Sequence, residues 1–437
     1  CQTYASSVTP TQPRYSTSHI TEAFEIHVSQ TIRDFYHLHN DDTSVVVACR
    51  RNQPVVSFFG DRLNRVNVAQ LSQLDRHEAP ASLSIEPSIS LTPTIGDGFL
   101  GRVGLEIHRG PAAWSLAPTL AQADASQLNL TLISRCSISD VEVTHQLKLD
   151  PDQSVLRLSV SIGNLSDETV LFIDNCAVTL PLRDHLSAFE EVTGRWAYEF
   201  QTERRSISRA AYVRENWTGR SSHHMNPTLT LLEKATSTTH GDALGVHLGW
   251  SGNHQLRIES LADGRRMLQA GELLRPGEIA LAPGAHYTSP SLYLCHSSAG
   301  QNGLTRQWHQ MIRREFIASQ NPVSTRRPVQ LNTWEALYFG VDEPSVLALM
   351  DQAATLGIER FVLDDGWFLG RADDQRALGD WEVDPQKFPN GLTPVIEACH
   401  DKGMEFGLWI EPEMVSQNST LYKAHPDWVL RHEGIPL

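Results

Sequence analysis

Apolar and polar residues alternate along much of the first 300 residues, with the period of two that is typical of strands with one buried face. The clearest example is VEVTHQLKLDPDQSVLRLSVSIGNL, residues 141–165. The residues that share its apolar side are Val143, His145, Leu147 and Leu149 before the turn, and Leu156, Leu158, Val160 and Ile162 after it. Because Asp150, Pro151 and Asp152 favour a turn, the segment predicts an antiparallel hairpin with one solvent-facing side.

Short runs of the same kind recur through this part of the chain, among them TSVVVAC, PVVSFF, TVLFID, ALGVHLGW and SLYLC. Gly, Pro, Asn and Asp separate these runs, and no segment here has a sustained helical period. The spacing predicts a large antiparallel sandwich over residues 22–303.

The pattern changes near residue 304, where LTRQWHQMIRREFI has a helical period. The residues expected on one face of this helix are Trp308, Met311, Ile312 and Phe316. Two prolines and several polar residues in SQNPVSTRRP then end the helical pattern. We therefore expect a linker helix and linker over residues 304–328, followed by a second domain.

From residue 329 onward, predicted strands and helices alternate. The strands are VQLNTW, RFVLDDGW and EFGLWIEP, and the helices are DEPSVLALMDQAATLG and TPVIEACHDKG. Asp342 and Pro344 are suited to the start of the first helix, and Gly357 to its end. Strands joined by helices pair in parallel through right-handed crossovers, so residues 329–437 are expected to form about three units of a (β/α)₈ TIM barrel.

Length and charge narrow the classes of protein. The chain has 437 residues, which suits two or three domains, and a formal net charge of −15, which disfavours nucleic acid and anionic lipid as partners. No apolar stretch approaches the roughly 20 residues of a membrane helix. We expect a soluble, cytoplasmic protein; secretion stays open because the sequence does not begin with Met.

Aromatic and acidic residues gather where the three barrel strands should end. Trp334 follows the first strand; Asp364, Asp365 and Trp367 follow the second; Trp409, Glu411 and Glu413 follow the third. Because active sites of such barrels form at the carboxyl ends of the strands, these residues predict a shared cleft. Aromatic faces stack on the C–H side of a sugar ring and carboxylates accept hydrogen bonds from hydroxyls, so the combination favours carbohydrate. Each residue alone is also compatible with packing or capping, and for the two glutamates both roles stay open.

A metal site is the alternative for the acids in DDGWFLGRADDQRALGDWEVD. Their spacing does not fit the Ca²⁺-binding loop, which requires acids at alternate positions and a Glu at the twelfth. The six cysteines lie far apart without a CxxC pair, so zinc and redox motifs are absent from the sequence. We expect no metal and no cofactor, and mostly buried, free thiols.

The chain resembles the α-galactosidases of glycoside hydrolase family 36. The resemblance rests on NTWEALYF, FVLDDGWF, LGDWEVDPQKFPNGL, GMEFGLWIEPEMVS and LYKAHPDWVL, in this order, and covers nearly all of residues 30–432. It implies an N-terminal β-supersandwich followed by a catalytic barrel. It also implies removal of terminal α-linked galactose from melibiose, raffinose or stachyose, with retention of configuration and without a metal. A homo-oligomer would be compatible with the intact enzyme.

The resemblance assigns roles to four residues. Asp364 and Asp365 would bind galactose hydroxyls, those on C4 and C6, and Trp334 and Trp409 would wall the pocket. Galactose differs from glucose by its axial C4 hydroxyl. A site whose buried acceptors need that hydroxyl rejects the epimer, since the acceptors would be left unpaired.

One departure from the family concerns catalysis. A retaining glycosidase needs two carboxyl groups about 5 to 5.5 Å apart on opposite sides of the scissile bond. Asp364 and Asp365 are consecutive, so their side chains are expected to diverge. The family's nucleophile lies in a KWDMNR-like segment that does not occur here, so we expect the nucleophile and the acid/base to lie beyond Leu437. The chain would then be a fragment, inactive alone and poorly stable in its second half. The alternatives are a galactosyltransferase of the raffinose-synthase type and a non-catalytic galactose-binding protein.

Overall fold

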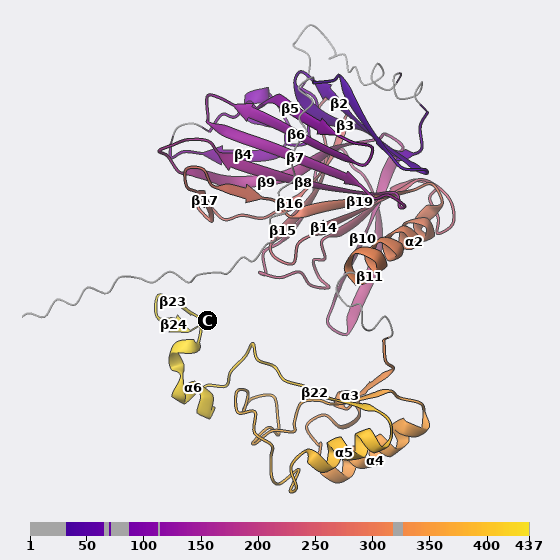
Figure 1. Ribbon diagram of the computed structural model, residues 1–437, viewed down its shortest axis with the longest axis vertical. Coiled ribbons are helices and arrows are strands. Elements are labelled where there is room, and N and C mark those ends of the chain that lie inside the picture. The colour runs from indigo at the N-terminus through magenta and orange to yellow at the C-terminus, as the bar shows by residue number, and fades with distance from the viewer. Residues whose placement is uncertain (1–31, 65–69, 71–86, 112–113, 318–326, 437) are drawn as a thin grey trace, which may run out of the picture. The chain divides into compact units, whose positions relative to one another are not determined.

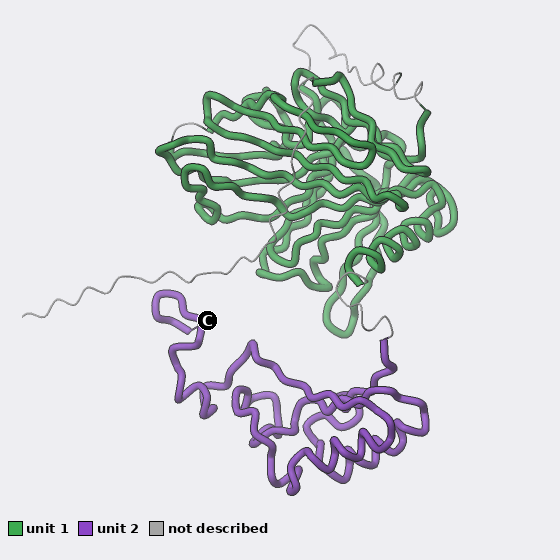
Figure 2. Tube along the Cα trace, in the orientation of Figure 1, with its two compact units in different colours: residues 1–319 green, residues 320–437 purple. Residues whose placement is uncertain are grey.

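The computed structural model of the chain describes residues 32–64, 70, 87–111, 114–317 and 327–436. The chain divides into two compact units, residues 1–319 and residues 320–437 (Figure 2). Parts of the predicted domains lie outside the described residues: 22–31, 65–69, 71–86 and 112–113 of the sandwich, 318–326 of the linker, and Leu437 of the barrel segment. The expectation that the catalytic carboxyl groups lie beyond Leu437 is therefore not tested by the structure and stays a prediction.

The first unit is built from antiparallel sheets (Figure 1). In spatial order, the largest sheet contains β11 (Tyr198–Ser206), β10 (Leu186–Arg195), β13 (Thr228–Glu233), β14 (Ala243–Gly249), β19 (Ser291–Ser297), β8 (Val155–Asn164), β7 (Val141–Leu149), β6 (Asn129–Cys136) and β5 (Thr119–Ala125), with β18 (His286–Thr288) beside β8. The second contains β12 (Tyr212–Asn216), β15 (His254–Ser260), β16 (Arg266–Glu272), β9 (Leu171–Leu182) and β17 (Ile279–Leu281), with β4 (Leu105–His108) beside β9. A third contains β1 (Phe35–His39), β2 (Thr43–Arg50) and β3 (Gln53–Asp61), and a short helix η1 spans Ile95–Asp97.

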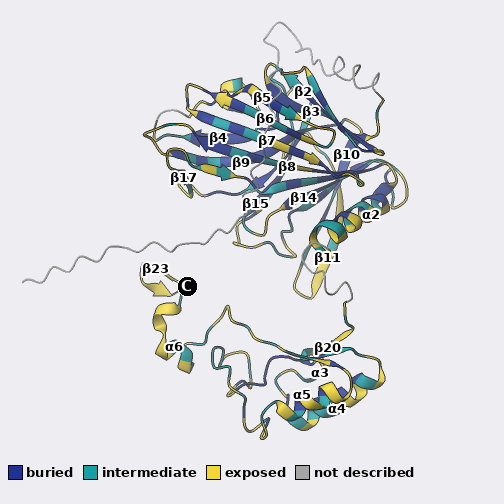
Figure 3. Cartoon of the chain, viewed as in Figure 1, coloured by how far each residue is buried: buried dark blue, intermediate teal, exposed yellow. Residues whose placement is uncertain are grey.

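The inward-facing residues of all three sheets form one continuous core. Buried residues alternate with more exposed ones along strands such as β6 and β7 (Figure 3). The predicted hairpin is confirmed as β7 and β8, which pair antiparallel from Val141 opposite Asn164 to Leu149 opposite Leu156. All eight residues predicted on its apolar side are buried, His145 included. The periodicity of the sequence therefore identified which face of this hairpin meets the core.

The helix expected in the linker packs against the sandwich. Helix α2 (Gly300–Ile312) and the following π-helical turn η2 (Arg313–Ile317) belong to the first unit. Leu304 and Met311 are buried in a small core together with residues of β8, β13 and β19. Gln307 accepts a hydrogen bond from the Ser154 backbone at 3.0 Å, and Arg314 forms an ion pair with Asp150. The first compact unit thus runs past the predicted boundary, because the helix buries its apolar face on the sheet.

The second unit begins with a strand–helix–strand–helix–strand pattern. Its elements are β20 (Gln330–Asn332), α3 (Trp334–Leu337), α4 (Glu343–Thr355), β21 (Arg360–Leu363), α5 (Thr393–Asp401), β22 (Glu405–Leu408), α6 (Thr420–Ala424), η3 (Pro426–Trp428), β23 (Arg431–His432) and β24 (Ile435–Pro436). Strand β21 lies between β20 and β22 and is parallel to both, with Leu331, Phe361 and Phe406 in register. The predicted parallel pairing is confirmed, and the arrangement fits the start of a (β/α) barrel.

Local sequence explains helix α4. Asp342 and Ser345 form a reciprocal capping box at its start, and Gly357, with a φ of 78°, follows its end. Val346, Met350 and Ala353 recur at helical spacing and are buried in a core that also contains Phe361 and Leu363. Strand and helix therefore share one apolar interior, which fixes the end of β21 relative to its neighbours.

The described ranges also bear on the expectations drawn from composition. In them, no helix has the length and apolar character that a membrane span requires. Cys49, Cys136, Cys176, Cys295 and Cys399 carry free thiols, and all but Cys49 are buried. No group of three or more His, Cys, Asp or Glu side chains in this part of the chain is placed to hold a metal ion.

Candidate functional site

The three parallel strands end at one hollow of about 650 Å³. The residues that line it include Asn332, Trp334, Phe339, Asp364, Asp365, Arg371, Asp374, Trp409 and Glu411. The structure therefore brings together the four residues that were predicted to bind a ligand: Trp334, Asp364, Asp365 and Trp409. They meet because the carboxyl ends of parallel strands share an edge of the sheet.

Asp364 follows directly on β21 and is held by the end of the neighbouring strand. Its backbone N–H donates to Oγ1 of the buried Thr333 at 2.9 Å. The Asn332 side-chain amide donates to Oδ2, and the Asp365 N–H donates to Oδ1 at 2.7 Å. With 8% of its surface exposed, the carboxylate is fixed in orientation and still borders the hollow.

Asp365 has a different partner. Arg371 Nε donates to its Oδ1 at 2.9 Å, and Nη2 donates to its Oδ2 at 2.7 Å. Both side chains are buried, and the guanidinium lies 5.3 Å from the Phe339 ring centre and 5.7 Å from that of Phe368. A bidentate pair beside two aromatic rings holds a carboxylate in one orientation, because both partners are planar. The two carboxylates thus bond to different neighbours, as the expected divergence of consecutive side chains requires.

Lys387 fixes the loop that carries Arg371. Its ammonium group donates to the carbonyls of Phe339, Gly366 and Arg371, at 2.9, 2.6 and 2.9 Å. Burial lowers the pKa of Lys387, and the nearby carboxylates partly offset this effect. Gly366 has a φ of 103°, and a Cβ there would lie 3.1 Å from the Phe339 backbone, so the turn after the two aspartates requires glycine.

The tryptophans at the strand ends have two different positions: two line the hollow, and one lies in the core. Trp334 and Trp409 line the hollow and are half-buried. Trp367 is buried in the core, and its indole N–H donates to the Trp409 carbonyl at 3.0 Å. Of the two glutamates whose roles stayed open, Glu411 lines the hollow, whereas Glu413 is exposed and is not among the lining residues.

Sequence reasoning missed Asn332, Phe339, Arg371 and Asp374. Asn332 is the last residue of β20, so the strand-end argument that selected Trp334 could have included it. Arg371 lies in a long loop, six residues after Asp365, and the sequence carries no periodic signal for it. Chemically, the hollow combines two oriented carboxylates with aromatic walls, which suits an uncharged ligand rich in hydroxyl groups.

Comparisons with known proteins identify the family. The chain matches the Glycosyl hydrolase family 36 N-terminal domain over residues 52–282 and the Melibiase family over residues 286–436. The chain belongs to glycoside hydrolase family 36. An alpha-galactosidase of Escherichia coli is 38% identical to it over 379 residues, which are 87% of this chain and 53% of the relative. The family resemblance noted in the sequence is thereby confirmed.

Solved structures of family 36 have the same fold. A variant of the alpha-galactosidase AgaA of Geobacillus stearothermophilus in complex with raffinose superposes with a TM-score of 0.80 at 27% identity, over 92% of this chain and 60% of that one. An alpha-galactosidase from Lactobacillus brevis superposes with a TM-score of 0.81 at 28% identity, over 91% and 57%. The chain spans about half the length of the curated relatives that it matches.

Proposed function

We propose that this family 36 protein acts on terminal α-linked galactose, and that the hollow at the ends of β20, β21 and β22 binds the galactosyl group. The observation that carries the proposal is the pair of buried carboxylates, Asp364 and Asp365, each with its own partner, beside Trp334 and Trp409. Relatives named alpha-galactosidases support the activity, and solved relatives in complex with raffinose or stachyose support galacto-oligosaccharides as substrates.

Asp364 and Asp365 are proposed as binding residues in a retaining double displacement. Asp365 is ion-paired to Arg371, which suits a fixed hydrogen-bond acceptor better than a nucleophile that must form a covalent bond. The nucleophile and acid/base are assigned to none of the described residues. Acceptors fixed at the C4 and C6 hydroxyls would select galactose over glucose, since the epimer leaves a buried carboxylate unpaired.

Calorimetric titration of galactose and glucose into the protein tests this proposal. Galactose is expected to bind more tightly than glucose, and Asp365→Asn is expected to cost about 1.5 to 3 kcal/mol of galactose binding, since a charged acceptor is lost. Asp373→Asn, at an exposed ion pair with Arg376, is the matched control and should leave binding unchanged.

Two outcomes would contradict the proposal. Equal affinity for the two epimers would remove the role given to the carboxylates. If wild-type residues 1–437 hydrolyse p-nitrophenyl α-galactoside and Asp365→Asn abolishes that turnover, Asp365 is a catalytic group, and not a binding residue only.

A further inference from the structure

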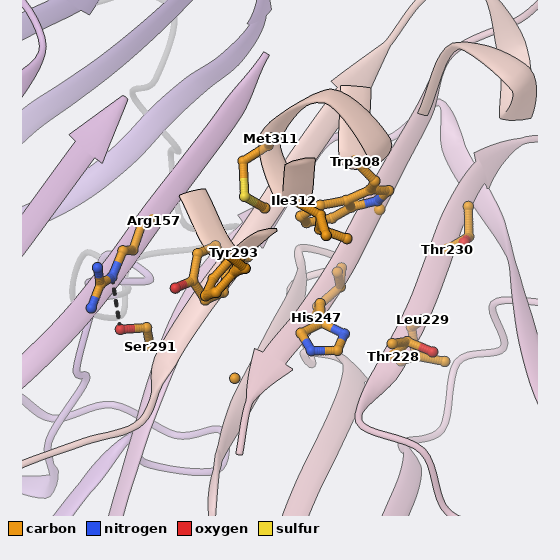
Figure 4. Close-up of a pocket in the computed structure, with 14 residues that line it drawn as sticks. Arg157, Thr228, Leu229, Thr230, His247, Ser291, Tyr293, Trp308, Met311 and Ile312 are labelled. Atoms are coloured by element: carbon orange, nitrogen blue, oxygen red, sulfur yellow. Dashed lines mark hydrogen bonds between the residues drawn. The ribbon is translucent and has the colours of Figure 1, made fainter. Parts of the chain in front are cut away.

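A second concave site lies in the first unit, where helix α2 crosses the largest sheet. It is a groove of about 490 Å³, within the range of roughly 300–1,000 Å³ that is usual for small-molecule sites. Trp308, Met311 and Ile312 enter it from the helix, and His247 and Tyr293 face them from β14 and β19 (Figure 4). None of these residues takes part in the hollow described above.

Two glycines on β14 give the groove its shape. A Cβ at Gly245 would lie 2.8 Å from the indole nitrogen of Trp308, and one at Gly249 would lie 3.0 Å from the Tyr293 ring. The two aromatic rings therefore lie directly against the strand, in space that any larger residue would fill. His247, between the glycines on the same face of β14, lies opposite Tyr293 on β19.

Polar groups in the groove lack protein partners. Within the described residues, the Trp308 indole N–H, the His247 ring and the Tyr293 hydroxyl make no hydrogen bond, while Arg157 uses Nε for the Ser291 hydroxyl at 2.9 Å and keeps both terminal nitrogens free. Burial lowers the pKa of His247, so its neutral ring offers one donor and one acceptor. The half-buried His247, Tyr293 and Trp308, with the exposed Arg157 beside them, are suited to a ligand with both hydroxyl groups and an apolar face.

We propose that this groove is a second saccharide-binding site, which holds one or two sugar units against Trp308 and Tyr293. A purely apolar ligand would leave the half-buried His247 ring unpaired, and an ionic one would meet a mostly apolar lining. The choice of a galacto-oligosaccharide rests on the proposed function, whereas the sugar class rests on the groove itself. A site of this kind would keep an oligosaccharide on the protein without taking part in its hydrolysis.

Calorimetric titration of raffinose into residues 1–437 and three variants tests the proposal. The wild type is expected to show two classes of site. Trp308→Ala should weaken one class at least about tenfold and leave the other unchanged, and Asp365→Asn should do the reverse. Trp217→Ala removes an exposed indole that lies against Arg275, outside the groove, and should change neither class.

The outcomes separate this inference from the proposed function. Loss of all raffinose binding in Asp365→Asn, with no effect of Trp308→Ala, would overturn the groove site and leave the proposed function standing. Binding that depends on Trp308 alone would support the groove and remove the proposed function.

Because Trp308 also packs against the sheet, Gly249→Ala serves as a second variant: its methyl group displaces the Tyr293 ring and should weaken the groove class of sites alone. No effect of Gly249→Ala together with a change of molecular mass in Trp308→Ala would identify the groove as a protein interface and overturn the proposal.

Discussion

Arg371 determines which part of the Asp365 carboxylate a ligand can reach. It occupies both carboxylate oxygens from one side, and its own third nitrogen, Nη1, donates to the Arg376 carbonyl at 2.7 Å. A lysine ammonium has a single charged centre and cannot make this planar, bidentate contact. The orientation of Asp365, a proposed ligand-binding group, therefore depends on its ion-pair partner Arg371.

Arg371→Lys should weaken galactose binding about as much as Asp365→Asn, because the carboxylate would lose its fixed orientation. In a double-mutant cycle the two changes should be clearly non-additive, which a general loss of stability would not produce. Calorimetric binding of galactose provides the measurement. Arg376→Lys, at an exposed ion pair with Asp373, is the control. Additive losses of binding for Arg371→Lys and Asp365→Asn would contradict the role given to Arg371.

At the scale of elements, the sequence predicts those helices and strands that depend on interactions between residues close together in the chain. The capping box of α4, the alternation along β7 and β8 and the apolar run before Asp364 depend on residues close in sequence, and the structure confirms these elements. The strand-end argument also placed Trp334, Asp364, Asp365 and Trp409 together. Arg371 and Lys387 could not be predicted in the same way, because their contacts depend on the path of a loop through tertiary space.

Helix α2 shows the same limit. Its amphipathic pattern predicts a buried face but does not say which surface covers that face, so the sequence alone predicts a helix within a linker. Met311→Ala should therefore destabilise the sandwich, by about 2–4 kcal/mol, because it leaves a cavity between α2 and the sheet. Urea unfolding measures the change in the free energy of unfolding, with hydrogen exchange of peptides from β8 and β19 as the probe of the sandwich. His309→Ala, exposed on the same helix, should have little effect; an equally small effect of Met311→Ala would show that the helix is not part of the folded unit.

At the scale of the whole molecule, the two units have separate apolar cores. The first unit contains a buried histidine whose titration couples its stability to pH. In the first unit, His145 of β7 is 3% exposed and lies in the core, with Nε2 at 2.9 Å from the Thr92 hydroxyl. Burial lowers its pKa to about 4, so the folded protein holds this ring neutral at pH values where an unfolded chain would protonate it.

The sign of the pH effect follows from this shift. Above about pH 6.5 both states are neutral at His145, and the residue contributes no pH dependence. Between about pH 6.5 and pH 4 only the unfolded state takes up the proton, so the first unit should lose about 3 kcal/mol of stability on acidification from this residue alone.

His145→Gln keeps an acceptor for Thr92 but cannot titrate. Between pH 7.5 and pH 4 its unfolding free energy should therefore fall by about 3 kcal/mol less than that of the wild type. Urea unfolding at both pH values, followed in peptides from β7 and β8, measures the difference, with His309→Gln as the exposed control. If wild type and His145→Gln lose the same stability, a neutral, buried His145 is not what makes the sandwich sensitive to acid.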